Sequence, residues 1–224
     1  MISIIIPVLN EENNIANLLR DLSDLPGKKE ILVVDGGSTD NTVELAEKYA
    51  EVIQDSRGRA NQMNEGTRHA KGNILWFVHS DSIVAKNSLE IIEKTVKKGS
   101  IAGGFSLYFH DSNKGFLRYI AFTSNLRASF IKLFFGDQGI FVKKDIFDAI
   151  GGYPQILIME DFQFSLNLKK KGRVTRVKEK IGTSSRRFTE GGAFKTFFLM
   201  QKMKILYMVG VSPEKLNKMY REIR

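Results

Sequence analysis

Two acidic residues come directly after apolar runs, a position from which carboxylates reach ligands in α/β proteins. Asp35 opens the polar segment Asp-Gly-Gly-Ser-Thr-Asp (35–40), and Asp81 follows the run 74–78 with His79 two residues before it. A carboxylate such as Asp35 accepts hydrogen bonds from a nucleobase edge. Asp81 and His79 suit a hard divalent cation whose other ligands are water and substrate oxygens. The structural alternative is that each acid caps the turn or helix that follows it.

A second acidic pair, Glu160 and Asp161, stands at the start of a helical pattern that stops at Gly172. A carboxylate at such a place is able to remove a proton from an attacking hydroxyl group. The alternative is electrostatic, because acids at a helix N-terminus gain roughly 0.3–1 kcal/mol from the helix dipole.

Two groups of basic residues suit a phosphorylated ligand. The loop Arg-Gly-Arg (57–59) is followed by Asn61 and Gln62 on one helical turn, and Arg186 is adjacent to Arg187. Guanidinium groups match phosphate oxygens in a bidentate manner. A solvated surface loop is the alternative for 57–59.

Apolar runs and helical patterns alternate in the N-terminal half, and these elements must position the polar residues. Strands are predicted at 2–8, 30–34, 51–54 and 73–78, and helices at 12–22, 42–49 and 61–70. The alternation predicts an α/β protein with a single Rossmann-like, mostly parallel sheet flanked by helices. Because ligands bind at the carboxyl ends of such strands, the polar segments 9–12, 35–40 and 79–82 are expected to converge.

The pattern is less regular after residue 100. Strands are predicted at 101–110 and 139–142, helices at 115–135, 144–150 and 160–171, and a pair of amphipathic helices after 191 that breaks near 211–213.

The composition restricts the function classes. The chain has 224 residues, no cysteine, and 34 Lys and Arg against 25 Asp and Glu, a net charge of +9. The charge predicts an anionic partner: nucleic acid, a membrane surface or a phosphorylated small molecule. The lack of cysteine excludes disulfides and thiol nucleophiles. No stretch reaches the ~18–20 apolar residues of a membrane span, and 2–8 is predicted to be a strand and not a signal peptide.

Four of these segments, in this order and spacing, resemble family 2 glycosyltransferases of the GT-A fold: 3–13, 31–42, 79–81 and 160–161. The segments 57–64, 136–139 and 185–187 are similar to a bacterial and archaeal subgroup whose members often lack transmembrane helices. The resemblance implies a glycosyltransferase domain at 1–190, with a nucleotide-sugar half (1–100) and an acceptor half (101–190), followed by a C-terminal helical extension (191–224).

The resemblance, together with the basic residues, also predicts the site. We expect the nucleotide sugar to contact Pro7, Leu9, Glu12, Asp35, Arg59, Gln62, Ser80 and Asp81. We expect the acceptor and phosphate groups to contact Asp137, Gln138, Glu160, Arg186 and Arg187. Asp81 and His79 would hold Mg²⁺ or Mn²⁺, and Asp161 would be the general base.

The implied activity is an inverting, metal-dependent transfer of a sugar from a nucleoside diphosphate to a hydroxyl acceptor. UDP is the first candidate nucleoside diphosphate and GDP the second, and a lipid-linked acceptor is one hypothesis. The sequence departs from the family at His79, where the first acid of the Asp-x-Asp motif is expected. This departure leaves open a protein that binds a nucleotide sugar with little or no catalysis.

The segment 193–209 mixes aromatic and aliphatic residues with three lysines. Two interpretations stay open: a helix in a membrane interface, or a helix docked on the core or in a homodimer contact. We expect a cytoplasmic protein, and membrane contact would make it peripheral on the inner face of the cell membrane. A rival class, nucleic-acid binding, predicts aromatic residues interleaved with basic ones. The aromatics cluster instead in the apolar segments 105–135 and 188–207, so no nucleic-acid partner is expected.

Overall fold

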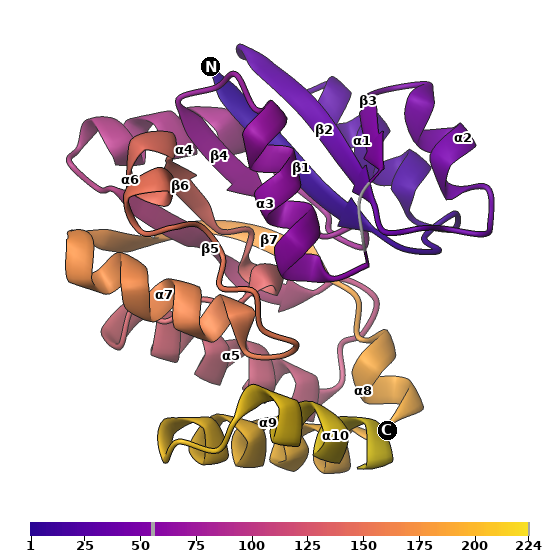
Figure 1. Cartoon of the computed structure of the whole chain (residues 1–224), viewed down its shortest axis with the longest axis vertical. Helices are drawn as coiled ribbons and strands as arrows, with labels where there is room; N and C mark the ends of the chain where they lie inside the picture. Colours follow the sequence, from indigo (N-terminus) through magenta and orange to yellow (C-terminus); the bar gives the residue numbers. More distant parts are fainter. Residues whose placement is uncertain (55–56, 224) are drawn as a thin grey trace.

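The computed structural model describes residues 1–54 and 57–223, with side chains through 220. One seven-stranded sheet forms its centre, in the order β3-β2-β1-β4-β6-β5-β7 (Figure 1). The strands are β1 (Ile2–Val8), β2 (Lys29–Asp35), β3 (Glu51–Gln54), β4 (Ile74–Phe77), β5 (Ala102–Phe109), β6 (Phe141–Lys143) and β7 (Val174–Thr183). Four neighbouring pairs are parallel, and β6 runs antiparallel to β4 and β5. The predicted mostly parallel sheet is confirmed.

The described part of the first half contains four helices, and the first three lie within a few residues of the predicted ranges. They are α1 (Ile15–Ser23), α2 (Thr42–Glu47), α3 (Arg59–His69) and α4 (Ser88–Lys97). The second half contains α5 (Gly115–Phe130), a 3₁₀ turn η1 (Gly136–Gln138), α6 (Lys144–Ala149), α7 (Glu160–Lys171), α8 (Arg186–Glu190), α9 (Ala193–Met208) and α10 (Pro213–Ile223).

Two of the differences from the prediction concern segments near the site. Helix α5 ends at Phe130, whereas the helical pattern predicted an end at residue 135. Lys132 has a left-handed backbone with φ 58°, which a continuing α-helix does not allow. The sequence pattern also missed β7, whose solvent-facing residues are charged and hide its apolar positions. These corrections matter because both segments approach the site.

The core lies on both faces of the sheet. Alternate residues of β1 point to opposite sides, so Ile4 and Ile6 join one apolar cluster and Ile5 joins the other. Helices α1 and α4 supply side chains to the first cluster, and α3 and α7 to the second. Burial of each of these isoleucine side chains stabilises the folded state by roughly 1.5–3 kcal/mol. The rigid three-layer arrangement fixes the carboxyl ends of β1, β2 and β4.

Helices α9 and α10 lie beyond the sheet, beside α5 and at the far end of the molecule from β2 (Figure 1). Met203 of α9 and Leu216 of α10 are buried against Leu133 and Phe162. The extension predicted from residue 191 therefore packs on the core through one face. Within the described part of the chain, no helix combines the length and apolarity of a membrane span.

Candidate active site

A cavity of about 700 Å³ opens where the carboxyl ends of the strands meet α5, α7 and α9. Eight of the predicted site residues line it: Arg59, His79, Asp81, Asp137, Glu160, Asp161, Arg186 and Arg187. Seven do not line it: Pro7, Leu9, Glu12, Asp35, Gln62, Ser80 and Gln138. The structure thus brings together most charged members of the predicted set, from segments up to 128 residues apart between Arg59 and Arg187.

Asp161 stands at the N-terminus of α7, directly after Met159 and Glu160. Its Oδ2 accepts a hydrogen bond of 2.9 Å from the backbone N–H of Gly136. Its Oδ1 is buried and has no hydrogen-bond partner among the described residues. Burial and the neighbouring Glu160 charge raise the pKa of Asp161 to about 7. One oxygen is therefore held in place, and the carboxyl group titrates near neutral pH.

His79 is the second group in the cavity with an unsatisfied polar atom. Its buried Nε2 finds no hydrogen-bond partner in the described part of the chain. Burial lowers the pKa of His79 well below its usual value, and the charges of Arg59 and Arg187 lower it further. The imidazole is therefore neutral.

Gly136 makes this arrangement possible. A Cβ at residue 136 would lie 2.3 Å from His79 Nε2 and 3.0 Å from Asp161 Oδ2, so a side chain does not fit. The imidazole Nε2 and the carboxylate Oδ2 consequently flank the same backbone position.

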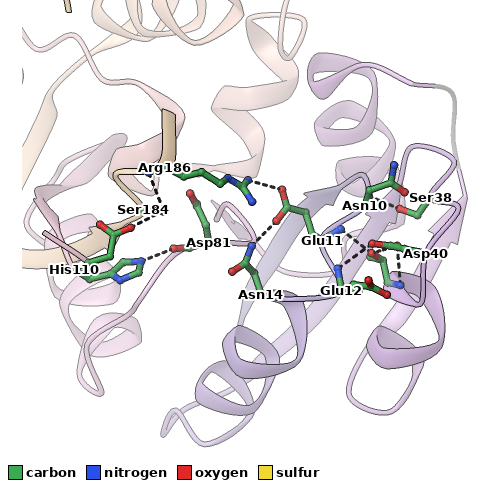
Figure 2. A network of polar contacts seen from close by, with 12 residues as sticks. Asn10, Glu11, Glu12, Asn14, Ser38, Asp40, Asp81, His110, Ser184 and Arg186 are labelled. Carbon is green, nitrogen blue, oxygen red and sulfur yellow. Dashed lines mark hydrogen bonds and ion pairs between the residues drawn. The ribbon is translucent and has the colours of Figure 1, made fainter. Parts of the chain in front are cut away.

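Asp81 lies beside an ion pair between Glu11, in the segment after β1, and Arg186 of α8 (Figure 2). Arg186 Nη2 lies 3.3 Å from Glu11 Oε1, and Asn14 Nδ2 donates to the other Glu11 oxygen at 2.7 Å. Burial raises the pKa of Asp81, and the Glu11 charge adds to this effect. His110 Nε2 donates to the Asp81 carbonyl at 3.2 Å. Two carboxylates that repel each other beside a cavity form an environment that a cation would stabilise.

Glu11 was absent from the predicted site, whereas Glu12 was included. Glu12 Oε2 accepts hydrogen bonds from the backbone N and the Nδ2 of Asn41, at 3.1 and 3.0 Å, and so binds the residue before α2. Both acids belong to the segment 3–13, and only the backbone path after β1 decides which one faces Asp81.

The Arg59 side chain enters the cavity from the first turn of α3. Its Nη1 lies 3.4 Å from Glu160 Oε1. Burial disfavours the charged guanidinium, but four surrounding carboxylates, led by Glu160 and Asp161, give the pKa of Arg59 a net upward shift. Arg59 is thus a permanent cation at the centre of the acidic residues.

The side chains of Asp35 and Gln62 form hydrogen bonds with backbone groups near the site. The Asp35 carboxylate accepts hydrogen bonds from the backbone N–H groups of Gly37 and Ser38, both at 3.0 Å. Gln62 Nε2 donates to the carbonyls of Val8 and Val34 at 2.8 Å each. Asp35 shapes its own turn, and Gln62 ties the ends of β1 and β2 together.

Gln138 and Asp137 follow Gly136 in η1. Gln138 Oε1 accepts a hydrogen bond of 2.8 Å from Arg127 Nη2, and its Nε2 donates to the Phe105 carbonyl at 3.2 Å. Asp137 lines the cavity, and burial raises its pKa. Gln138 therefore positions Arg127, a cavity residue of α5 that the sequence did not single out.

A divalent metal is the cofactor that the sequence implies. Among the side chains that the structure describes, no three His, Asp or Glu residues are grouped closely enough to hold a metal ion. Mg²⁺ commonly binds through one or two carboxylates together with substrate phosphates and water. Asp81, with Glu11 beside it, fits this mode. His79 Nε2, which points to Gly136 and Asp161, is a neutral nitrogen and a less suitable ligand for Mg²⁺.

Comparison with solved structures identifies the architecture. The chain resembles a mannosyltransferase from Pyrobaculum calidifontis in complex with GDP-Man and Mn²⁺, with a TM-score of 0.71, 17% identity and coverage of 97% of this chain and 67% of the other. It also resembles S. aureus TarS in complex with UDP-GlcNAc, with a TM-score of 0.66, 19% identity and coverage of 82% and 58%. The shared fold is GT-A.

Comparison with known sequences also finds glycosyltransferases. The chain is 26% identical over 191 residues to the poly-β-1,6-N-acetyl-D-glucosamine synthase of Staphylococcus aureus, covering 76% of this chain and 46% of the synthase. It is 28% identical over 173 residues to the glycosyltransferase AglE of Haloferax volcanii, covering 70% and 57%. The chain spans about half the length of these relatives. The model of "Glycosyl transferase family 2" matches residues 3–153, more than half of the chain, and the protein belongs to that family.

Proposed function

We propose that this protein transfers a sugar from a nucleoside diphosphate sugar to a hydroxyl group, with inversion at the anomeric carbon and Asp161 as general base. A UDP-sugar is the first candidate donor and a GDP-sugar the second. The observation that carries the proposal is the state of Asp161: one oxygen held by Gly136 N–H, the other unpartnered among the described residues, and a pKa of about 7.

A general base works best when its pKa lies near the operating pH. At neutral pH a large fraction of Asp161 is ionised, yet the group is still basic enough to accept a proton. An acid with its ordinary pKa near 4 would be ionised but a weaker base. Glu160 contributes by raising the pKa of Asp161, and it cannot do the same work itself because Arg59 pairs with it.

The reaction breaks one bond and forms one. The acceptor oxygen forms a bond with the anomeric carbon as its proton passes to Asp161, and the bond from that carbon to the diphosphate oxygen breaks. The nucleoside diphosphate leaves with the electron pair. Attack and departure on opposite faces of the sugar invert the configuration.

The leaving diphosphate needs positive charge near Asp81. Arg59, Arg186 and Arg187 line this part of the cavity. Asp81, with Glu11 beside it, would hold Mg²⁺ or Mn²⁺, which neutralises charge on a diphosphate when bound. Stabilising the developing negative charge is usually the largest contribution to such a transfer. Asp35 shapes the turn that would receive the nucleobase.

A thermal-shift panel tests the donor. UDP-, GDP- and dTDP-sugars are added with and without Mn²⁺, and a ligand that binds only the folded state stabilises it by RT ln(1 + [L]/Kd). We expect one nucleotide series to raise Tm and Mn²⁺ to increase the effect. A panel in which no nucleotide sugar raises Tm would overturn the proposal.

A second candidate function is nucleotide-sugar binding without turnover, because His79 stands where the family's first metal-binding acid is expected. Asp161→Asn separates the two. An enzyme loses about 10²–10⁴-fold in turnover with Asp161→Asn, the usual contribution of a general base. Equal, slow donor hydrolysis by wild type and variant would favour the binding protein.

We also propose that the chain is peripheral at an anionic membrane surface. Exposed apolar side chains recur at helical spacing on α5 (Tyr119, Phe122, Leu126, Phe130) and on α9 (Phe194, Phe198, Ile205, Met208), each at least 45% exposed. Phe116 stacks on Phe194 at 3.9 Å between ring centroids and joins the two faces. Exposed lysines at 195 and 202 flank the apolar face of α9. An apolar face bordered by lysines suits anionic lipid.

Sedimentation with vesicles tests the membrane face. We expect binding to vesicles that contain anionic lipid, weaker binding at high salt, and loss of binding in Phe198→Ser. The control is Tyr49→Ser, an exposed aromatic just after α2, a helix that lies at the other end of the molecule from α9 (Figure 1). Binding that Phe198→Ser does not weaken would contradict the proposal, and a wild type that dimerises in ultracentrifugation through this face would assign it to a homodimer.

A further inference from the structure

Two helices present matching side chains to the wall of the cavity. The lining residues of α5 are Ile120, Thr123, Ser124 and Arg127, and those of α9 are Phe197, Met200, Gln201, Met203 and Lys204. On each helix an apolar residue comes first and a cation follows seven residues later, which is about two turns or ~10 Å. The same order on both walls gives this part of the cavity an apolar end and a cationic end.

The two cations converge on one aromatic ring. The Arg127 guanidinium carbon lies 4.4 Å from the Phe135 ring centroid, and Lys204 Nζ lies 5.4 Å from it. Arg127 donates to the Leu133 carbonyl at 3.2 Å and to Gln138, and Lys204 donates to Gln201 Oε1 at 3.1 Å. These neutral contacts hold both side chains in place without neutralising them.

Acidic partners are scarce at this end. Across residues 1–54 and 57–220, neither Arg127, Arg187 nor Lys204 forms an ion pair with a carboxylate. All three cations, together with Arg59, lower the pKa of Asp137, which burial raises. Burial lowers the pKa of Arg127 to about 10 and that of Lys204 to about 8. Arg127 and Lys204 are half-buried, and a partly desolvated charge without an ionic partner is costly, so these two cations indicate a place for an anion.

The apolar end leads toward the surface. Ile120 belongs to a cluster with Phe109 and Phe188, and Phe197 packs against it. Phe197 also contacts Phe116, which stacks on the exposed Phe194. An apolar chain that starts at the cations would therefore run along residues continuous with the exposed apolar face.

We propose that Arg127 and Lys204 form an anion subsite in the acceptor part of the cavity, which holds a phosphate group carried on an apolar chain. The acceptor is then an amphiphile whose hydroxylated head group reaches Asp161 while its phosphate rests between α5 and α9. The inference rests on the proposed function, because it names the class of acceptor for the same site.

Isothermal titration of decyl phosphate into the full chain, saturated with UDP and Mn²⁺, tests the subsite. The variants are Lys204→Met and Arg127→Gln. The control is Lys97→Met, which removes an exposed lysine from α4, outside both the cavity and the apolar face of α9. We expect each cavity variant to weaken decyl phosphate binding about ten-fold or more, the usual effect of losing a charged hydrogen-bond partner, and the control to bind like wild type.

Two further ligands identify the source of the anion. Decanol, which lacks the phosphate, should bind wild type and Lys204→Met alike. Inorganic phosphate, which lacks the chain, should bind much more weakly than decyl phosphate. Equal affinity for both phosphates would assign the cations to a free phosphate and overturn the lipid part of the proposal.

The pH dependence gives a readout that a merely structural role would not change. The charged groups that face Lys204 are Arg127 on α5 and Asp137 on η1. Because Lys204 loses its proton above about pH 8, wild-type affinity for decyl phosphate should fall there, whereas Lys204→Met should lack this step. Arg127 also supports Gln138, so Lys204→Met decides the outcome if Arg127→Gln does not fold.

Different results would contradict the anion subsite and the proposed glycosyltransferase function. A chain that binds UDP but shows the same decyl phosphate affinity in all variants has no such subsite. Binding of decyl phosphate to the UDP-free chain but not to the UDP-saturated chain would place the anion in the donor site and also overturn the proposal. A wild type that binds no nucleotide at all would overturn the proposed function itself.

Discussion

Replacing Asp161 with asparagine should stabilise this protein at alkaline pH while it lowers turnover. Asp161 has a folded-state pKa of about 7 against an ordinary value of 3.8. The folded state therefore holds a proton that the unfolded state releases between these two values. The Asp161 contribution to stability is complete below about pH 4, declines as pH rises, and is lost above about pH 7.

The size of the stability change follows from the pKa shift of Asp161. About three pKa units at 1.36 kcal/mol each correspond to roughly 4 kcal/mol of lost stability above pH 7. Asparagine keeps an oxygen to accept the Gly136 N–H, but its amide N–H₂ replaces the unpartnered Oδ1 and costs about 1–3 kcal/mol. The net gain from Asp161→Asn is thus about 1–3 kcal/mol at about pH 8. For a chain of this size, that corresponds to a Tm increase of roughly 2–12 °C.

Thermal unfolding of wild type and Asp161→Asn at about pH 5 and pH 8 is the assay. The gain at pH 8 should exceed the gain at pH 5 by about 3 kcal/mol, because the wild-type carboxyl is mostly protonated at the lower pH. The control is Asp145→Asn, an exposed acid that lies 3.4 Å from Lys143 and should change stability by less than about 0.5 kcal/mol. A variant whose Tm difference from wild type is the same at both pH values would refute the raised pKa of Asp161.

Three further outcomes are expected. Glu160→Gln removes the charge that raises the pKa of Asp161, so the acid limb of the kcat/KM profile should move to lower pH by about one unit; an unmoved limb would separate Glu160 from the base. Gly136→Ala brings a Cβ within 2.3 Å of His79 Nε2 and should cost about 1–3 kcal/mol in chemical denaturation together with most of the activity. Asp81→Asn should remove the Mn²⁺-dependent part of the nucleotide-sugar thermal shift, and retention of that part would place the metal elsewhere.

The N-terminal fold could be predicted because local patterns and tertiary contacts agree there. The apolar run of β1 is buried on both faces of the sheet, as a parallel strand requires, and β3 and α7 begin and end where the sequence predicts. The sequence predicted a wrong end for α5 and did not predict β7, and both errors have a tertiary cause. Apolar residues continue past Phe130 because residues 133–135 are buried by other elements, and β7 is recognisable chiefly through its pairing with β5.

By itself, the sequence determined which residue types follow the strands and open α7, and with them the acids Asp81 and Asp161 and the family. Tertiary structure alone decided which neighbours act on them. Glu11 and not Glu12 faces Asp81, Gln62 ties two strands, and Gln138 holds Arg127. Side-chain direction in an irregular segment follows no period, so a sequence pattern cannot supply it. The meeting of Arg127 with Lys204 depends on how α9 packs beside α5, a long-range contact that no local signal records.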